Sequence, residues 1–140
     1  MKLERLTPEQ WTWLASTAHR AVFQELRDAG VDRVHHVLLA VEGAEPIGYM
    51  TIQERDAHTA HIQFGGAFPP VRGSLKAVRA WSLALGRLKE SYRRVTMRVE
   101  NTNRPMLKLA LAMHFKVVGI HVQADKILLE HALNFYDKEC

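Results

Sequence analysis

The residues with the clearest chemical meaning form a short loop between an expected strand and an expected helix: Arg72-Gly73-Ser74-Leu75-Lys76-Ala77. A glycine-containing loop in that position offers unpaired backbone N–H groups and the positive end of a helix dipole, which together can bind phosphate. Arg72 and Lys76 add positive charge to the loop. The loop therefore predicts a site for a ligand that carries phosphate.

The charge distribution also favours an anionic partner. Nineteen Lys and Arg against fifteen Asp and Glu give the 140 residues a formal charge of +4. Between Arg72 and Lys116, however, eleven basic residues face only two acids, whereas the remainder has eight basic and thirteen acidic residues. The segment thus carries about +9 and the rest about −5. A solvated basic face without a ligand is the alternative interpretation.

Composition indicates one globular domain over residues 1–140, since 47% of the residues are hydrophobic and 24% are charged. The longest apolar run, Val37–Val41, is too short to cross a membrane, so no membrane partner is expected. The single cysteine, Cys140, allows no internal disulfide. A reducing, cytoplasmic setting is the expectation that fits.

The elements that must position the loop follow from periodicity and capping signals. A helix is expected from the capping box at Thr7 to Gly30, and two more from the caps at Ser74 and Asn103. Strands are expected at 34–41, 47–53, 59–64, 95–99, 117–122 and 127–129. The order predicts an α/β fold of the mixed α+β kind. Its central sheet should be mixed and mostly antiparallel, with about six to seven strands and helices on both faces.

Gly65 and Gly66 end the third of these strands, where glycine usually marks a bulge or a close backbone approach. An ordinary glycine bulge stays open as an alternative. His61 lies earlier in the same strand, and its unperturbed pKa of about 6.5 suits proton transfer near neutrality.

Three segments together resemble the GNAT superfamily of acyl-CoA-dependent N-acyltransferases. Ala60 to Gly73 is similar to the fourth strand and pyrophosphate loop of that family, without a gap. Val99-Glu100-Asn101-Thr102-Asn103 is similar to the end of its fifth strand, and Phe115 follows Asn103 at the family's spacing. The likeness covers most of the chain from Ile47 to Val122.

The resemblance implies an N-acetyltransferase that moves an acetyl group from acetyl-CoA to an unidentified primary amine, of a small molecule or a protein, by direct attack. It implies that the backbone N–H groups of Gly65, Gly66 and Ala67 contact the pantetheine arm and the thioester oxygen. The loop Arg72 to Ala77 would hold the pyrophosphate, and Asn103 would complete the cofactor site. His61 stands where the family often has glutamate, so it is the first candidate for the general base, with Glu54 second.

Two departures from the family pattern keep other functions open. Leu75 replaces the central glycine of the loop, and Ala110 replaces the tyrosine that often protonates the leaving thiolate. A GNAT-like protein that binds CoA or a partner without turnover is therefore one alternative. A nucleic-acid-binding protein is less favoured, because the basic residues are interleaved with core positions and form no recognised motif. The eight histidines show no ligand spacing, so no metal is expected, and a homodimer stays open.

Overall fold

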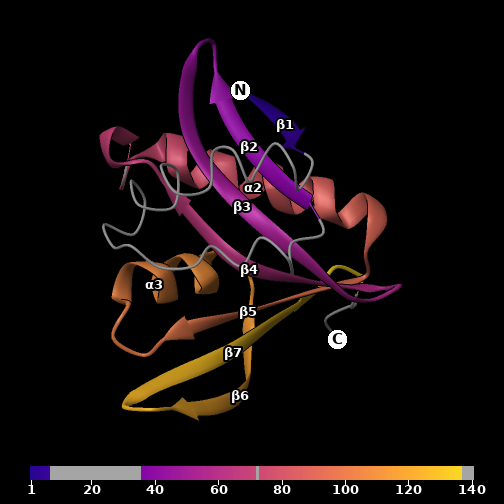
Figure 1. The fold of residues 1–140 in the computed structure, drawn as a ribbon, viewed down its shortest axis with the longest axis vertical. Coiled ribbons are helices and arrows are strands. Elements are labelled where there is room, and N and C mark those ends of the chain that lie inside the picture. Colours follow the sequence, from indigo (N-terminus) through magenta and orange to yellow (C-terminus); the bar gives the residue numbers. More distant parts are fainter. Residues whose placement is uncertain (7–35, 72, 137–140) are drawn as a thin grey trace. The chain divides into compact units, whose positions relative to one another are not determined.

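Seven strands, two α-helices and one 3-10 turn form the described part of the protein (Figure 1). The computed structural model describes residues 1–6, 36–71 and 73–136. The elements are β1 (Lys2–Leu6), β2 (His36–Glu42), β3 (Glu45–Asp56), β4 (Thr59–Ala67), η2 (Pro69–Val71), α2 (Leu75–Ser91), β5 (Arg94–Glu100), α3 (Arg104–Ala112), β6 (Lys116–Gln123) and β7 (Lys126–Asn134). The helix expected from Thr7 to Gly30 lies outside the described residues.

The strands form a mixed, mostly antiparallel sheet, which confirms the predicted fold class. Their order is β1-β2-β3-β4-β5-β7-β6. β2 pairs antiparallel with β1 and β3, and β7 pairs antiparallel with β5 and β6, whereas β4 and β5 are parallel. A parallel pair needs a crossover connection, and α2 supplies it. No described helix is long and apolar enough to cross a bilayer.

The strand β1 was not predicted from the sequence, where residues 1–6 were assigned no strand. It pairs with β2 from Lys2 opposite Val41 to Leu6 opposite Val37. Leu3 packs against a buried apolar cluster of Ala40, Ile47 and Val71. Its charged residues are exposed, because an edge strand needs only enough apolar side chains to cover one face of its neighbour.

The chain divides into two compact units, which are described separately. The first unit contains Met1–Gln53 and Gln63–Arg87, and therefore β1, β2, most of β3, the end of β4 and most of α2. Its buried core includes Leu38 and Ile47 from the strands and Trp81 from α2. Ser74 precedes α2 as expected, and the helix buries apolar side chains at spacings of three and four.

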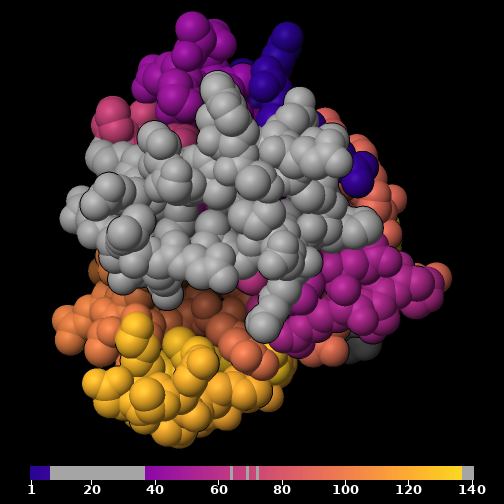
Figure 2. Space-filling model, in the orientation of Figure 1, coloured from indigo at the N-terminus to yellow at the C-terminus, as the bar shows by residue number. Residues whose placement is uncertain are grey.

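The second unit contains Glu54–Ile62 and Leu88–Cys140, with β5 at its centre. β5 pairs with β7 from Arg94 opposite Asn134 to Glu100 opposite Leu128. The strand β7 is thus longer than the predicted 127–129 and continues to Asn134. Part of the surface of β7 is the yellow region in Figure 2. β6 ends the strand order and exposes apolar side chains, among them Ile120 and Val122.

Candidate functional site

In the first unit, the end of β4 lies very close to β3. A Cβ atom built on Gly48 of β3 would lie 2.5 Å from the carbonyl oxygen of Gly66. The N–H of Phe68 also donates a hydrogen bond of 2.9 Å to the carbonyl oxygen of Ile47. Only glycine fits at Gly48 without displacing β4. The sequence predicted a close approach at Gly66 but did not single out Gly48, although a glycine inside a strand carries the same signal.

The predicted pantetheine contacts are the last three residues of β4, Gly65, Gly66 and Ala67. All three are half-buried and belong to the first unit. Their predicted contacts with the pantetheine arm and the thioester oxygen stay predictions.

The turn between η2 and α2 leads directly into the N-terminus of α2. Gly73 has a φ angle of 76°, which favours glycine over any residue with a side chain. The N–H and the hydroxyl of Ser74 both donate to the carbonyl oxygen of Val71, at 3.1 and 2.6 Å. α2 begins at Leu75, and its first turn carries no acidic residue. Because the first N–H groups of a helix have no acceptor within it, this turn is suited to an anion.

The remaining loop residues differ in what they can contribute to such a site. The side chain of Leu75 is 74% exposed. The Lys76 ammonium lies 3.4 Å from a carboxylate oxygen of Glu45 and 3.8 Å from one of Glu42, so two acids partly neutralise its charge. Ala77 faces inward and lines a pocket. Arg72 lies outside the described residues, so its predicted phosphate contact stays a prediction.

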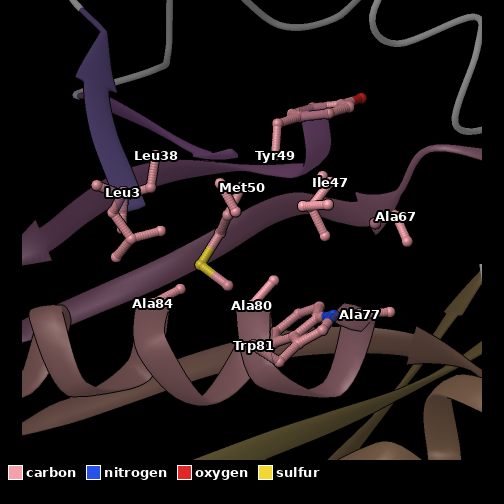
Figure 3. Close-up of a pocket in the computed structure, with 13 residues that line it drawn as sticks. Leu3, Leu38, Ile47, Tyr49, Met50, Ala67, Ala77, Ala80, Trp81 and Ala84 are labelled. Atoms are coloured by element: carbon pink, nitrogen blue, oxygen red, sulfur yellow. The ribbon is translucent and has the colours of Figure 1, made fainter. Parts of the chain in front are cut away.

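An apolar pocket lies between α2 and the strands of the first unit (Figure 3). Ala80 and Trp81 of α2 and Met50 of β3 point toward one another, while Tyr49 points away from the helix. The pocket is lined by Leu3, Leu38, Ala40, Ile47, Gly48, Tyr49, Met50, Gly66, Ala67, Ala77, Ala80, Trp81 and Ala84. No lining residue is charged, so the pocket itself is not suited to phosphate, in contrast to the turn at Gly73.

In the second unit, His61 of β4 is buried and neutral. Its side chain lies beside Thr96 of β5, with 2.8 Å between Nδ1 and Oγ1, and only 9% of the residue is exposed. Burial, followed by the positive charges of Arg55 and Arg98, lowers the pKa of His61 to about 4, while Glu130 acts in the opposite direction. His61 therefore does not keep the unperturbed pKa of about 6.5 on which its candidacy as a base was founded. The ring stays unprotonated throughout the neutral range, and its low pKa makes it a weaker base than an exposed histidine.

Glu54, the second candidate base, belongs to β3 and points to the opposite face of the sheet from Arg55. Its carboxylate accepts a hydrogen bond of 2.9 Å from the hydroxyl of Tyr92, the residue that follows α2. Arg55, the next residue, forms an ion pair with Glu130 at 3.3 Å. Because consecutive residues of a strand point to opposite faces, Glu54 points away from the face that holds Arg55 and Glu130. The structure thus does not bring the two predicted bases together.

Asn103 and Ala110 belong to α3. The side-chain oxygen of Asn103 accepts a hydrogen bond of 3.3 Å from the N–H of Met106, so Asn103 caps the helix. Ala110 is 1% exposed. This methyl group is packed in the interior and supplies no proton donor. The predicted contact of Asn103 with the cofactor stays a prediction.

Arg55, Arg98, Thr96 and Glu130 were not predicted as site residues, although all four surround or influence His61. The sequence offered only a weak signal, the alternation of polar Thr96 and Arg98 along a strand. Among the described residues, no group of three His, Cys, Asp or Glu side chains is arranged to hold a metal ion.

The comparisons with known proteins agree in fold. No protein-family model matches the sequence, and no curated protein is significantly similar to it. Solved structures do match. The IAA acetyltransferase from Bacillus cereus ATCC 14579 is 14% identical, with 96% of this chain and 99% of that chain covered and a TM-score of 0.77.

Two further structures are similar over nearly their whole length. The ribosomal-protein-S18-alanine N-acetyltransferase from Escherichia coli has a TM-score of 0.78 at 10% identity, covering 99% of this chain and 96% of that one. A GNAT family acetyltransferase from Elizabethkingia anophelis, solved with acetyl-CoA bound, has a TM-score of 0.78 at 12% identity and covers 96% and 97%. The protein therefore has the fold of the GNAT acetyltransferases.

Proposed function

We propose that this protein transfers an acetyl group from acetyl-CoA to a primary amine, which attacks the thioester directly. The observation that carries the proposal is the helix start after β4, where the left-handed turn at Gly73 leads through Ser74 into a first turn without acids. This arrangement fits the pyrophosphate of CoA, because unpaired N–H groups and the helix dipole both favour an anion. Acetyl-CoA supplies the activated acyl group.

The chain's own residues account for the movement of the proton. As the amine nitrogen bonds to the carbonyl carbon, it must lose a proton, and the C–S bond then breaks. We propose His61 as the acceptor of that proton, because its imidazole is neutral and held by Thr96. Ala110 stands where the resemblance places a tyrosine, and its buried methyl group cannot protonate the thiolate. The thiolate can leave unaided, since the pKa of a thiol is about 8.5.

Binding and turnover can be tested on the purified protein. Calorimetric titration with acetyl-CoA at low and moderate salt should show saturable binding that weakens with salt, because phosphate contacts are partly ionic. A panel of primary amines should then be screened for release of free CoA. Failure to bind acetyl-CoA at either salt concentration would overturn the proposal.

Gly73→Ala and Gly43→Ala form a matched pair for the proposed phosphate turn. Both glycines have positive φ, 76° and 61°, and a Cβ at either would meet no atom within 4 Å. Each substitution should therefore cost about 1 to 2 kcal/mol of stability through backbone strain alone. Only Gly73→Ala should weaken binding of acetyl-CoA, by about tenfold or more. Equal CoA affinities in the two variants would show that the turn at Gly73 does not hold the phosphates.

A CoA-binding protein without turnover is the second candidate, and the buried methyl group of Ala110 favours it. Saturable binding of acetyl-CoA without release of free CoA across the whole amine panel would support this second function over the first.

A further inference from the structure

A row of polar side chains crosses the sheet of the second unit on one face. The register places His61 of β4 beside Thr96 of β5, and Arg98 of β5 beside Glu130 of β7. Thr96 and Arg98 are two residues apart in one strand and so point to the same side. His121 of β6 reaches the same carboxylate, at 3.7 Å. Side chains from four strands thus lie on one face of the sheet, where His61 and Thr96 are buried and Arg98, Glu130 and His121 are partly exposed.

The ion pairs in this row are unbalanced. One oxygen of Glu130 lies 3.3 Å from Nη1 of Arg55 and 3.6 Å from Nε of Arg98, while the other faces His121. Two permanent cations therefore share one carboxylate, so the three groups have a net charge of +1. The Arg55 and Arg98 side chains are 35% and 40% exposed, whereas that of Glu130 is 19% exposed. The positive groups, more than the acid, are accessible to a ligand.

The same cations act on His61. Burial is the main reason that the pKa of His61 is low, and the positive charges of Arg55 and Arg98 lower it further against the opposite effect of Glu130. A substrate that places its amine at His61 would therefore bring its neighbouring atoms into a positive field. An additional positive group on the substrate would be repelled there, and an anionic group would be attracted.

We propose that Arg55 and Arg98 bind an oxyanion of the acceptor, and that the acceptor is a primary amine that also carries a carboxylate, such as an amino acid. This inference rests on the proposed acetyl transfer and assigns its substrate class. A guanidinium presents several N–H donors in a planar fork that matches the geometry of a carboxylate. The bound carboxylate offsets the unbalanced positive charge and holds the amine near His61. A row that serves only to join strands would bind no anion.

Matched acceptors show whether the row of polar side chains binds an anion or only joins the strands. An α-amino acid, its carboxamide and its phosphonate analogue share the carbon skeleton and differ in the anionic group. Because the pKa of the amine also differs among them, each kcat/KM is expressed per concentration of unprotonated amine. The wild-type protein should acetylate the amino acid with a kcat/KM about tenfold or more above that of the carboxamide. A preference for the phosphonate over the carboxylate would overturn the carboxylate assignment, and equal values for acid and carboxamide would overturn the proposal as a whole.

Arg98→Gln tests the residue. This variant should lose the preference for the acid over the carboxamide, chiefly through a higher KM for the acid. Arg104→Gln removes the same charge from α3, outside the row, and should leave the preference unchanged. Arg55→Gln is the second variant, in case Arg98→Gln proves unstable. A preference that survives in both Arg55→Gln and Arg98→Gln would overturn the proposal.

A binding measurement makes the result independent of turnover. The ring signals of His61, assigned by comparison with His61→Asn, should shift when the protein is titrated with an N-acetylated amino acid, and not with its carboxamide. The shift should disappear in Arg98→Gln. Shifts with the acid but no acetyl transfer to any amine would refute the proposed enzyme and leave this site standing. Acetyl transfer without a carboxylate preference and without a selective shift would refute the carboxylate site and leave the proposed enzyme standing.

Discussion

The buried, neutral state of His61 makes the stability of the protein depend on pH. In the unfolded chain the pKa of this residue has its ordinary value of 6.5, and in the folded protein burial, Arg55 and Arg98 lower it to about 4. Between these values the unfolded state binds more protons than the folded state. The free energy of unfolding contributed by His61 is therefore fully present above about pH 6.5 and is lost as the pH falls toward about 4.

The size of this loss follows from the two pKa values. Linkage gives a decrease of about 2 kcal/mol in the free energy of unfolding between about pH 7 and about pH 4.5. Carboxylates also titrate in this range, so the test compares the wild type with His61→Asn, which cannot become charged. Urea denaturation across the pH range should show a steeper loss for the wild type, by that amount.

His114→Asn is the matched control for this measurement. His114 is exposed and has a φ angle of 68°, which asparagine tolerates better than most residues. Because His114 is exposed, the stability of His114→Asn should follow the wild-type pH dependence. If the curves of wild type and His61→Asn run parallel, His61 is hydrated in the folded protein, and both its assignment as a neutral base and the field of the arginines would be refuted.

Two further predictions concern backbone packing and catalysis. Gly48→Ala should lower the free energy of unfolding by about 2 kcal/mol or more, because the new methyl group would meet the carbonyl oxygen of Gly66 at 2.5 Å. Gly86→Ala, whose Cβ would meet no atom within 4 Å, should instead raise it by about 0.5 to 1 kcal/mol in urea denaturation. Losses of similar size in the two variants would contradict the close approach of the strands. In acetyl transfer, kcat/KM should rise as the amine deprotonates, with no inflection near pH 6.5, where an exposed histidine would titrate.

Local signals were sufficient for most of the fold. Ser74 and Asn103 predicted the starts of α2 and α3, because a capping side chain and the apolar period that follows lie within a few residues. The strand β7 was predicted only over residues 127–129, so Glu130 and His131 were not assigned to it. In the structure both residues stay in the strand. Glu130 is held by ion pairs, and the His131 ring bonds to the carbonyl oxygen of Leu129.

The turn at Gly73 and the surroundings of His61 depend on different kinds of information, and only the first could be predicted from the sequence. The turn at Gly73 is a local feature, and a glycine followed by a serine before an apolar helical pattern predicts it. The surroundings of His61 are not local, since Thr96 lies 35 residues away and Arg55 meets Glu130 across 75 residues. Those contacts exist only once the strand register is set. Burial and the two arginines then determine the pKa of His61, which the sequence alone left at its ordinary value.

An acceptor carboxylate at Arg55 and Arg98 should also change the basicity of His61. Both guanidiniums lower the pKa of the imidazole, so an anion bound between them should raise that pKa toward its ordinary value. The base would then be strongest when the acceptor is bound. Burial still lowers the pKa in the complex, so by thermodynamic linkage an N-acetylated amino acid should bind more tightly as the pH falls from about 6.5 toward about 4, and its carboxamide should not. Titration of the His61 ring signals with each ligand measures both effects, and a midpoint that the acid leaves unmoved would mean that the anion binds elsewhere.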